Sequence, residues 1–363
     1  MINADFNKLK NDFDINNIFD SISSFGSQIN ESFSIMDDCL KKYSNNFKEI
    51  RNKKISSVLI CGMGGSAIGG ELSKIALSKD ISVPIIINRS ADIPNWVNKE
   101  TLVIVSSYSG NTYETIQAYE QSKSKTNLII IIASCAPSKL NDFSQRYNHI
   151  KLDIPLGIQP RCALGYSSSI ITILFMNLNL IDSSKSDDLK SASSLLTSVQ
   201  LENLKDICSP NNNPAILLAS KIQNQIPVIY GSEDFSSIIA LRFKNQLQDN
   251  SKLMAFSNNY PEINHNEIEG LDSSGNYFVI WLSDEKGQSD VFNSAQKLLN
   301  QLGVKQISID LKNHLGRIEN RLEILYASIY FFDWVSYYLA LLQNQNPCSI
   351  DNIKYVKQNN ALL

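Results

Sequence analysis

Two turns rich in glycine and hydroxyl side chains are the parts of this sequence best suited to chemistry. The first, Gly62-Met63-Gly64-Gly65-Ser66, follows one apolar run, and the second, Ser107 to Thr112, follows another. Glycines allow positive φ angles and a close approach of the backbone. The unpaired N–H groups of a helix that starts there attract anions. The first turn therefore predicts an anion site, and Ser66 adds a hydroxyl donor suited to a phosphate.

The first turn alone does not distinguish a phosphate-monoester site from its alternatives. A triphosphate loop needs Gly-Lys-Ser/Thr, which is absent here. Gly62-x-Gly64-x-x-Ala67 also fits the dinucleotide fingerprint, which requires an acidic residue about 20 residues later. The next apolar run ends instead in Asn88 and Arg89. A tight turn without any ligand is the third alternative.

The second turn strengthens the phosphate interpretation. Asn111 followed by Glu114 resembles a capping box, which predicts a helix start. Ser107, Ser109 and Thr112 then lie at or just before that helix. Successive parallel strands end at one edge of an open α/β sheet, where ligands bind. We therefore expect both turns to converge on one phosphate.

The elements around these turns alternate between strand and helix patterns, which implies parallel strands with helices on both faces. Strands are expected at 57–61, 83–88, 101–106, 127–133 and 149–153, and helices at 66–79, 112–123, 138–147 and 167–182. Apolar runs at 226–232 and 277–283, followed by helical patterns at 235–248 and 290–302, repeat this arrangement. The repeat lacks the glycine and hydroxyl richness, so one phosphate-binding set per chain is expected.

The chain is predicted to divide into four parts. Residues 1–50 form an N-terminal helical segment, 51–185 a domain with the phosphate loops, 186–213 a connecting segment with a helix at about 187–205, and 214–363 a second domain with C-terminal helices. The apolar segment 322–342 contains Glu323 and Asp333, which favours a buried helix over a membrane span.

Composition excludes several functional classes. The chain has 363 residues, 43% hydrophobic and 19% charged, with a net charge of −3, as in an ordinary globular protein without a basic nucleic-acid surface. Six scattered cysteines without a C-x-x-C pair and the lack of a signal-peptide pattern predict free thiols in the cytoplasm. The three histidines show no metal-ligand spacing, so neither a metal nor another cofactor is expected.

The segments Gly62 to Gly70 and Ser107 to Thr115 resemble the signature loops of the sugar isomerase (SIS) domain. More narrowly, they resemble those of the bifunctional phosphoglucose/phosphomannose isomerases, over residues 55–357. This implies an α/β protein with two SIS domains, each a doubly wound parallel sheet flanked by helices. It also implies metal-free interconversion of glucose 6-phosphate, and of mannose 6-phosphate, with fructose 6-phosphate through an enediolate. The implied phosphate ligands are Gly65, Ser66, Ser107, Ser109 and Thr112.

The resemblance also assigns two groups around the reacting carbons. Arg161 lies in a segment similar to the family's Pro-Arg-x-Ala-Leu-Gly-Tyr, whose arginine faces the substrate, so it would stabilise the enediolate with its permanent charge. From the residues alone it could equally pair with a surface carboxylate. His265 lies in a segment similar to Pro-Glu-x-x-His-Asn-Glu, whose histidine handles the ring-opening proton from the partner subunit. An obligate homodimer is implied.

The base and the lysine match the family less closely. Asp249 stands where relatives carry the glutamate that abstracts the proton, and it is one methylene shorter. Glu262 and Glu267 are alternative bases, although they fit better as groups that orient their neighbours. The C-terminal segment resembles the family's terminal motif, in which Lys357 would be the active-site lysine that assists ring opening, with Lys354 as the alternative.

Two rival functions stay open at this point. SIS domains also serve regulators that bind a sugar phosphate without turning it over, and the change to Asp249 favours such a sensor. Residues 1–50, however, lack the basic character of a DNA-binding helix pair. An isomerase for an amino sugar or a pentose phosphate would use the same fold.

Overall fold

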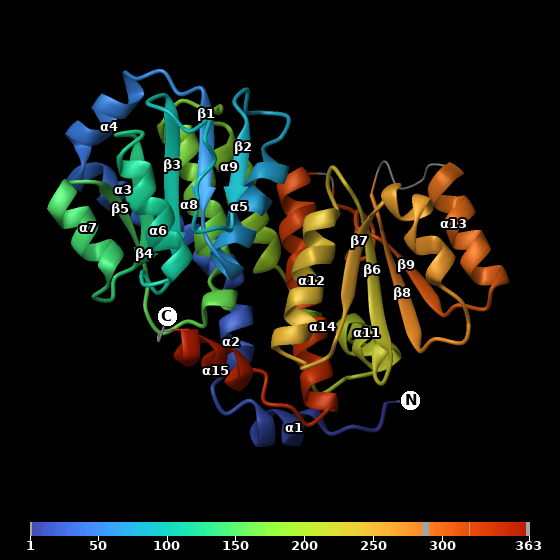
Figure 1. Cartoon of the computed structure of the whole chain (residues 1–363). Coiled ribbons are helices and arrows are strands. Elements are labelled where there is room, and N and C mark those ends of the chain that lie inside the picture. The colour runs from blue at the N-terminus through green and yellow to red at the C-terminus, as the bar shows by residue number, and fades with distance from the viewer. Residues whose placement is uncertain (1, 285–289, 319, 361–363) are drawn as a thin grey trace. The chain divides into compact units, whose positions relative to one another are not determined.

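The computed structural model describes residues 2–284, 290–318 and 320–360 (Figure 1). The chain divides into two compact units, which are described separately. The first-sheet unit comprises Ser24–Thr197 and Arg321–Glu323, and the second-sheet unit comprises Met1–Ser23, Ser198–Asn320 and Ile324–Leu363. The four-part division expected from the sequence stays a prediction.

The first-sheet unit is built on five parallel strands in the order β2-β1-β3-β4-β5. They are β1 (Ser57–Cys61), β2 (Ile85–Asn88), β3 (Thr101–Ser107), β4 (Ile129–Ser134) and β5 (Ile150–Ile154). The strands β1, β3 and β4 are buried along their whole length, as continuous apolar runs require in a parallel sheet.

Helices cover both faces of this sheet (Figure 1). They are α3 (Phe25–Lys42), α4 (Ser44–Arg51), α5 (Gly64–Ala76), α6 (Tyr113–Lys123), α7 (Lys139–Tyr147), the short η1 (Pro160–Cys162), α8 (Leu164–Asn177) and α9 (Lys185–Leu196). Side chains of α6 and α7 join Val103 and Val105 in one hydrophobic cluster. On the other face α5 packs on Ile60 and on α8, which places the start of α5 beside the end of β1.

The second-sheet unit repeats this order with four parallel strands, β7-β6-β8-β9. They are β6 (Ile226–Ser232), β7 (Phe256–Tyr260), β8 (Tyr277–Ser283) and β9 (Gln306–Asp310). The helices are α1 (Phe6–Phe13), α2 (Ile18–Ser23), α10 (Val199–Glu202), η2 (Asn203–Lys205), α11 (Pro214–Ile222), α12 (Ser237–Asp249), η3 (Glu262–His265), η4 (Glu267–Gly270), α13 (Asp290–Gln301), α14 (Arg321–Leu342) and α15 (Asp351–Asn360).

The predicted α/β fold with two parallel sheets is confirmed, and several details differ. The single helix expected at 187–205 is wrong, because the backbone is extended at Ser198 and separates α9 from α10. The strands β7 and β9 were not predicted. Both lie at edges of their sheet and carry polar or partly exposed residues, so they lack the apolar run of a central strand.

The helix α14 is apolar enough to cross a membrane by length and composition, but its hydrophobic window is entirely buried inside the protein. The prediction of a buried helix is therefore confirmed. Its Asp333 is 5% exposed and accepts hydrogen bonds from Nε and Nη2 of Arg242 at 3.1 and 2.8 Å. This two-point geometry compensates the cost of burying both charges.

All six cysteines are free thiols. Cys39, Cys61, Cys162 and Cys348 are buried, whereas Cys135 and Cys208 are exposed. Burial raises the pKa of Cys39 and of Cys61 to about 12, which keeps both as neutral thiols at physiological pH.

Replacing Asp333 by alanine should destabilise the second-sheet unit by about 3–5 kcal/mol, because the Arg242 guanidinium would stay buried without its carboxylate. Urea unfolding followed by circular dichroism measures the loss. Asp38→Ala is the matched control, since the Asp38–Lys41 pair is exposed on both sides and its loss should change stability by less than about 0.5 kcal/mol. Equal effects of the two substitutions would contradict this account.

Candidate active site

The first glycine turn forms a tight connection from β1 to α5. Gly64 begins the helix with a φ of +51°, a left-handed conformation that favours glycine, and it is exposed. A Cβ on Gly62 would lie 2.9 Å from the carbonyl oxygen of Ser106, so the first turn touches the strand that leads into the second. The N–H of Ser66 donates to the Met63 carbonyl oxygen at 3.1 Å, so the N–H groups of Gly64 and Gly65 are the ones at this helix start that remain for a ligand. Ser66 is half-buried in that first helical turn.

The second turn gathers three hydroxyl groups. Ser107 Oγ lies 3.0 Å from Thr112 Oγ1 and 3.5 Å from Ser109 Oγ, and Ser109 Oγ lies 3.4 Å from Thr112 Oγ1. Ser107 is buried, Thr112 is half-buried and Ser109 is exposed, so the cluster reaches from the core to the surface. It lies directly before α6, whose N-terminal end favours negative charge. The cluster can donate hydrogen bonds to an anion.

One local prediction for this turn is wrong. The residue before α6 is Thr112 rather than Asn111, and its side chain makes no capping hydrogen bond. The Asn111 side chain instead accepts a hydrogen bond from the N–H of Lys139 at 3.0 Å. The capping box with Glu114 is therefore not formed, because Asn111 holds the turn against the start of α7.

Arg161 lies against the first turn. A Cβ on Gly65 would be 2.9 Å from the carbonyl oxygen of Pro160 and 3.5 Å from Cα of Arg161, so only glycine lets the two segments meet at this distance. Arg161 is 7% exposed, so it is a buried arginine rather than a surface one. The side chain of Gln28 supports the same segment by donating a hydrogen bond to the carbonyl oxygen of Cys162 at 2.8 Å.

Tyr108 is a residue of the second turn that the sequence did not single out. Its hydroxyl donates a hydrogen bond to the carbonyl oxygen of Pro155 at 2.8 Å and accepts one from the N–H of Ile158 at 3.2 Å. Burial raises the pKa of Tyr108, so it stays a neutral donor. It ties the hydroxyl turn to the segment that leads to Arg161. Its position inside the SIS signature loop was the one feature of the sequence that could have pointed to it.

Asp249 is the last residue of α12 and is half-buried. The helix end is fixed on α14, because Asn250 donates to Ser336 Oγ at 2.9 Å and Ser251 to the Ser336 carbonyl at 2.6 Å. The ammonium group of Lys252 donates to the carbonyl oxygens of Asp249 and of Ser349. It thus links the end of α12 to the segment before α15.

His265 is exposed at the end of η3, the short helix that follows β7. The carboxylate of Glu267 fixes the adjoining segment by accepting hydrogen bonds from Tyr230 at 2.9 Å and from Asn258 at 2.6 Å. Glu262 accepts one from Asn266 at 3.1 Å. Both glutamates are thus engaged with neighbouring side chains, as expected of orienting groups.

Lys357 and Lys354 both lie on the exposed helix α15. Lys354 is 3.8 Å from the Asp351 carboxylate. Within the part of the chain that the structure describes, the side chains of Asp249, His265 and Lys357 have no hydrogen-bond or ion-pair partner. All three belong to the second-sheet unit, whereas Arg161 and the hydroxyl cluster belong to the first-sheet unit. The assigned catalytic roles stay predictions.

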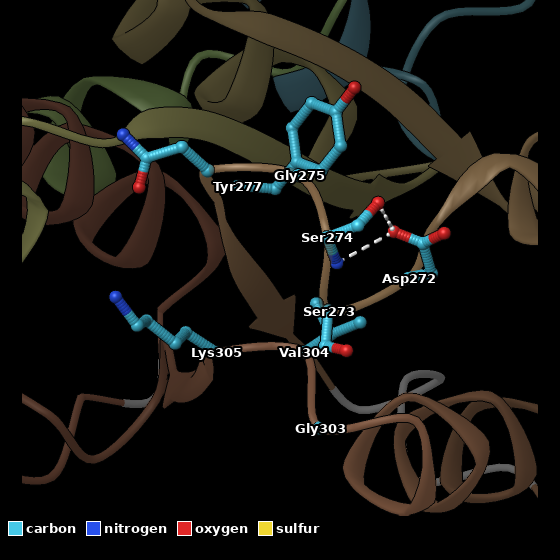
Figure 2. A pocket seen from close by; sticks show the side chains of 9 residues that line it. Asp272, Ser273, Ser274, Gly275, Tyr277, Gly303, Val304 and Lys305 are labelled. Carbon is cyan, nitrogen blue, oxygen red and sulfur yellow. Dashed lines mark hydrogen bonds between the residues drawn. The ribbon is translucent and has the colours of Figure 1, made fainter.

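A pocket of about 250 Å³ lies elsewhere in the second-sheet unit. Figure 2 shows its lining, in which Ser274 donates two hydrogen bonds to the Asp272 carboxylate and Lys305 lies on the opposite wall. Tyr277 starts β8 and Lys305 precedes β9, so this pocket is at the amino edge of the sheet. Open α/β sheets bind ligands at the other edge.

Comparisons with known proteins agree with this architecture. Residues 49–181 match the SIS domain family, and residues 211–359 match the family described as bacterial phospho-glucose isomerase C-terminal SIS domain. The C-terminal domain of glucosamine-fructose-6-phosphate aminotransferase from Francisella tularensis has a similar structure, with a TM-score of 0.68 and 16% sequence identity over 90% of this chain and 96% of that chain. That likeness shows the shared fold.

Two relatives give closer comparisons. A bifunctional phosphoglucose/phosphomannose isomerase from Caldicellulosiruptor bescii is 34% identical over 94% of this chain and 98% of its own length. A D-glucosamine-6-phosphate 4-epimerase from Sulfolobus acidocaldarius is 30% identical over 62% of this chain and 68% of its own length. With two SIS domains and this similarity along nearly its whole length, the chain belongs to the family of bifunctional phosphoglucose/phosphomannose isomerases.

Proposed function

We propose that this protein interconverts glucose 6-phosphate and mannose 6-phosphate with fructose 6-phosphate. The observation that carries the proposal is the cluster of Ser107, Ser109 and Thr112 hydroxyls before α6, next to a glycine turn that contacts Arg161. Hydroxyl donors at a helix start suit a phosphate monoester, and the guanidinium adds positive charge near the sugar. The similarity to an isomerase along nearly the whole chain supports the same substrate class.

In the proposed mechanism the phosphate is anchored by Gly65, Ser66 and the hydroxyl cluster. His265 transfers the proton that opens the sugar ring, and the ammonium group of Lys357 assists ring opening. Asp249 then moves a proton between C1 and C2. Arg161 stabilises the enediolate that exists after the proton has left one carbon and before it is returned to the other. Asp249 can serve as this base because its carboxylate is not engaged by any described side chain. Neither ring opening nor proton transfer needs a metal.

The D-glucosamine-6-phosphate 4-epimerase relative supports a second candidate, an enzyme acting on an amino-sugar phosphate. It is less favoured because that similarity covers 62% of this chain, against 94% for the isomerase. Turnover of glucose, mannose, fructose and glucosamine 6-phosphates by one preparation distinguishes the two. Tight binding of a sugar phosphate with turnover of none would favour the sensor.

Replacing Asp249 by asparagine should lower kcat for fructose 6-phosphate by about 100- to 10,000-fold, because the amide cannot accept the proton. A coupled assay of glucose 6-phosphate formation measures kcat, and calorimetry should show that binding is retained. Glu262→Gln and Glu267→Gln are the matched controls and should keep proton transfer. A larger loss of kcat in either control than in Asp249→Asn would identify a different base.

Replacing Thr112 by valine should lower kcat/KM for fructose 6-phosphate by about 10- to 100-fold, since a hydrogen bond to a charged group contributes about 1.5–3 kcal/mol. The loss should appear mainly in KM, as expected for an anchor remote from the reacting carbons. Thr112→Ser retains the hydroxyl and serves as the control. Equal kinetics for the valine and serine variants would contradict the phosphate assignment.

We further propose that the active enzyme is a homodimer in which His265 serves the site of the other copy. Asp249→Asn and His265→Ala subunits, each inactive alone, should regain activity when unfolded together and refolded. Hybrid dimers would then hold one intact site of two, giving about a quarter of the wild-type activity in an equal mixture. No recovery, although mixed dimers are detected by mass spectrometry, would place both residues in one subunit's site.

A further inference from the structure

The second sheet contains a copy of the first glycine turn. The two sheets share one strand order, so β6 corresponds to β1, β8 to β3 and α12 to α5. Gly231 lies near the end of β6 as Gly62 follows β1. A Cβ on Gly231 would lie 2.5 Å from the carbonyl carbon and oxygen of Ser236, just before α12. The tight contact between strand end and helix start is therefore present in both copies.

The two turns differ in their side chains and in the hydrogen bonds that these make. In the second copy the buried Ser232 hydroxyl donates a hydrogen bond to Oδ2 of Asp284. The buried Ser236 hydroxyl lies 3.1 Å from the same Oδ2 and 3.1 Å from the Leu282 carbonyl oxygen, so its one proton is shared between these two acceptors. The two serines also bind each other, since the Ser232 N–H lies 2.7 Å from Ser236 Oγ and the Ser236 N–H 3.2 Å from Ser232 Oγ. The carboxylate is thus held by paired hydroxyls that are fixed in place.

Asp284 directly follows β8, the strand that corresponds to β3. In the first sheet this position leads into the hydroxyl cluster, and within the described residues no carboxylate is hydrogen-bonded to Ser107, Ser109 or Thr112. Neither α5 nor α12 has an acidic residue in its first turn. Asp284, on a neighbouring turn, therefore places a carboxylate beside the positive start of α12, in addition to Glu233 and Asp234 in the loop before it.

We propose that the Asp284 carboxylate is a built-in substitute for phosphate in the second-sheet unit. The inference rests on the proposed function in one respect, namely that the corresponding turns of the first-sheet unit bind phosphate. The second-sheet unit then takes no phosphate of its own, and each chain binds a single sugar phosphate. Removal of the carboxylate would open an anion site made of Ser232, Ser236 and the start of α12.

The test is thermal unfolding of the full-length Asp284→Ala variant over a range of inorganic phosphate concentrations. Without phosphate its Tm should fall below that of the wild type. Phosphate should then raise its Tm by at least about 2 °C more than it raises that of the control. The control is Asp272→Ala, which removes a carboxylate also bonded to a serine hydroxyl, in the same unit but at the amino edge of its sheet (Figure 2).

A Tm response to phosphate no larger in Asp284→Ala than in Asp272→Ala overturns the inference. Asp284→Ser, prepared in phosphate buffer, provides the same comparison if the alanine variant does not fold. Adding Thr112→Val to both variants weakens phosphate binding at the hydroxyl cluster of the first-sheet unit equally in both, and the extra response of the Asp284 variant should persist. A lack of sugar-phosphate turnover would refute the proposed function, whereas a lack of this extra response with turnover intact would refute the inference alone.

Discussion

The close contact between a helix start and a strand end is the constraint on which the candidate site depends. Gly62 and Gly65 allow the first turn to touch the end of β3 and the segment of Arg161, because any side chain there would meet a carbonyl oxygen at 2.9 Å. Gly69 continues the contact along α5, since a Cβ there would overlap Ser167 on α8. The glycine turn, the hydroxyl turn and the segment that carries Arg161 thereby lie close together, without any charged residue in the glycine turn itself. The geometry, rather than one strong ligand, makes this edge of the sheet suited to an anion.

Much of the first-sheet unit could be predicted from the sequence, since its strands are continuous apolar runs and its turns carry glycine and serine. The same reasoning missed β7 and β9, whose polar residues reflect edge positions that only the finished sheet defines. The sequence reasoning also placed the N-cap of α6 at Asn111, because asparagine followed by glutamate is typical of a cap. In the structure the Asn111 side chain binds the start of α7 instead, a contact that the local pattern does not show.

The candidate site shows a similar limit. Spacing and residue type indicated the hydroxyl cluster, and its mutual distances agree with that expectation. The role of Tyr108 depends on backbone groups about 50 positions away in the chain, at Pro155 and Ile158, and no local pattern encodes such a contact. The assignment of Asp249, His265 and Lys357 came from family resemblance, since a single acid, histidine or lysine in a polar segment carries no signal of its own.

The hydrogen bonds of Tyr108 also couple two events that are usually considered separately. The residue lies inside the hydroxyl turn, and it grips the segment that ends at Arg161. An anion that orders the turn therefore also orders the segment from Pro155 to Ile158, which leads to Arg161. In the proposed mechanism, binding energy from the phosphate would in this way help to position Arg161 near the reacting carbons. For the proposed isomerisation, a sugar without its phosphoryl group would then show a lower kcat as well as a lower affinity.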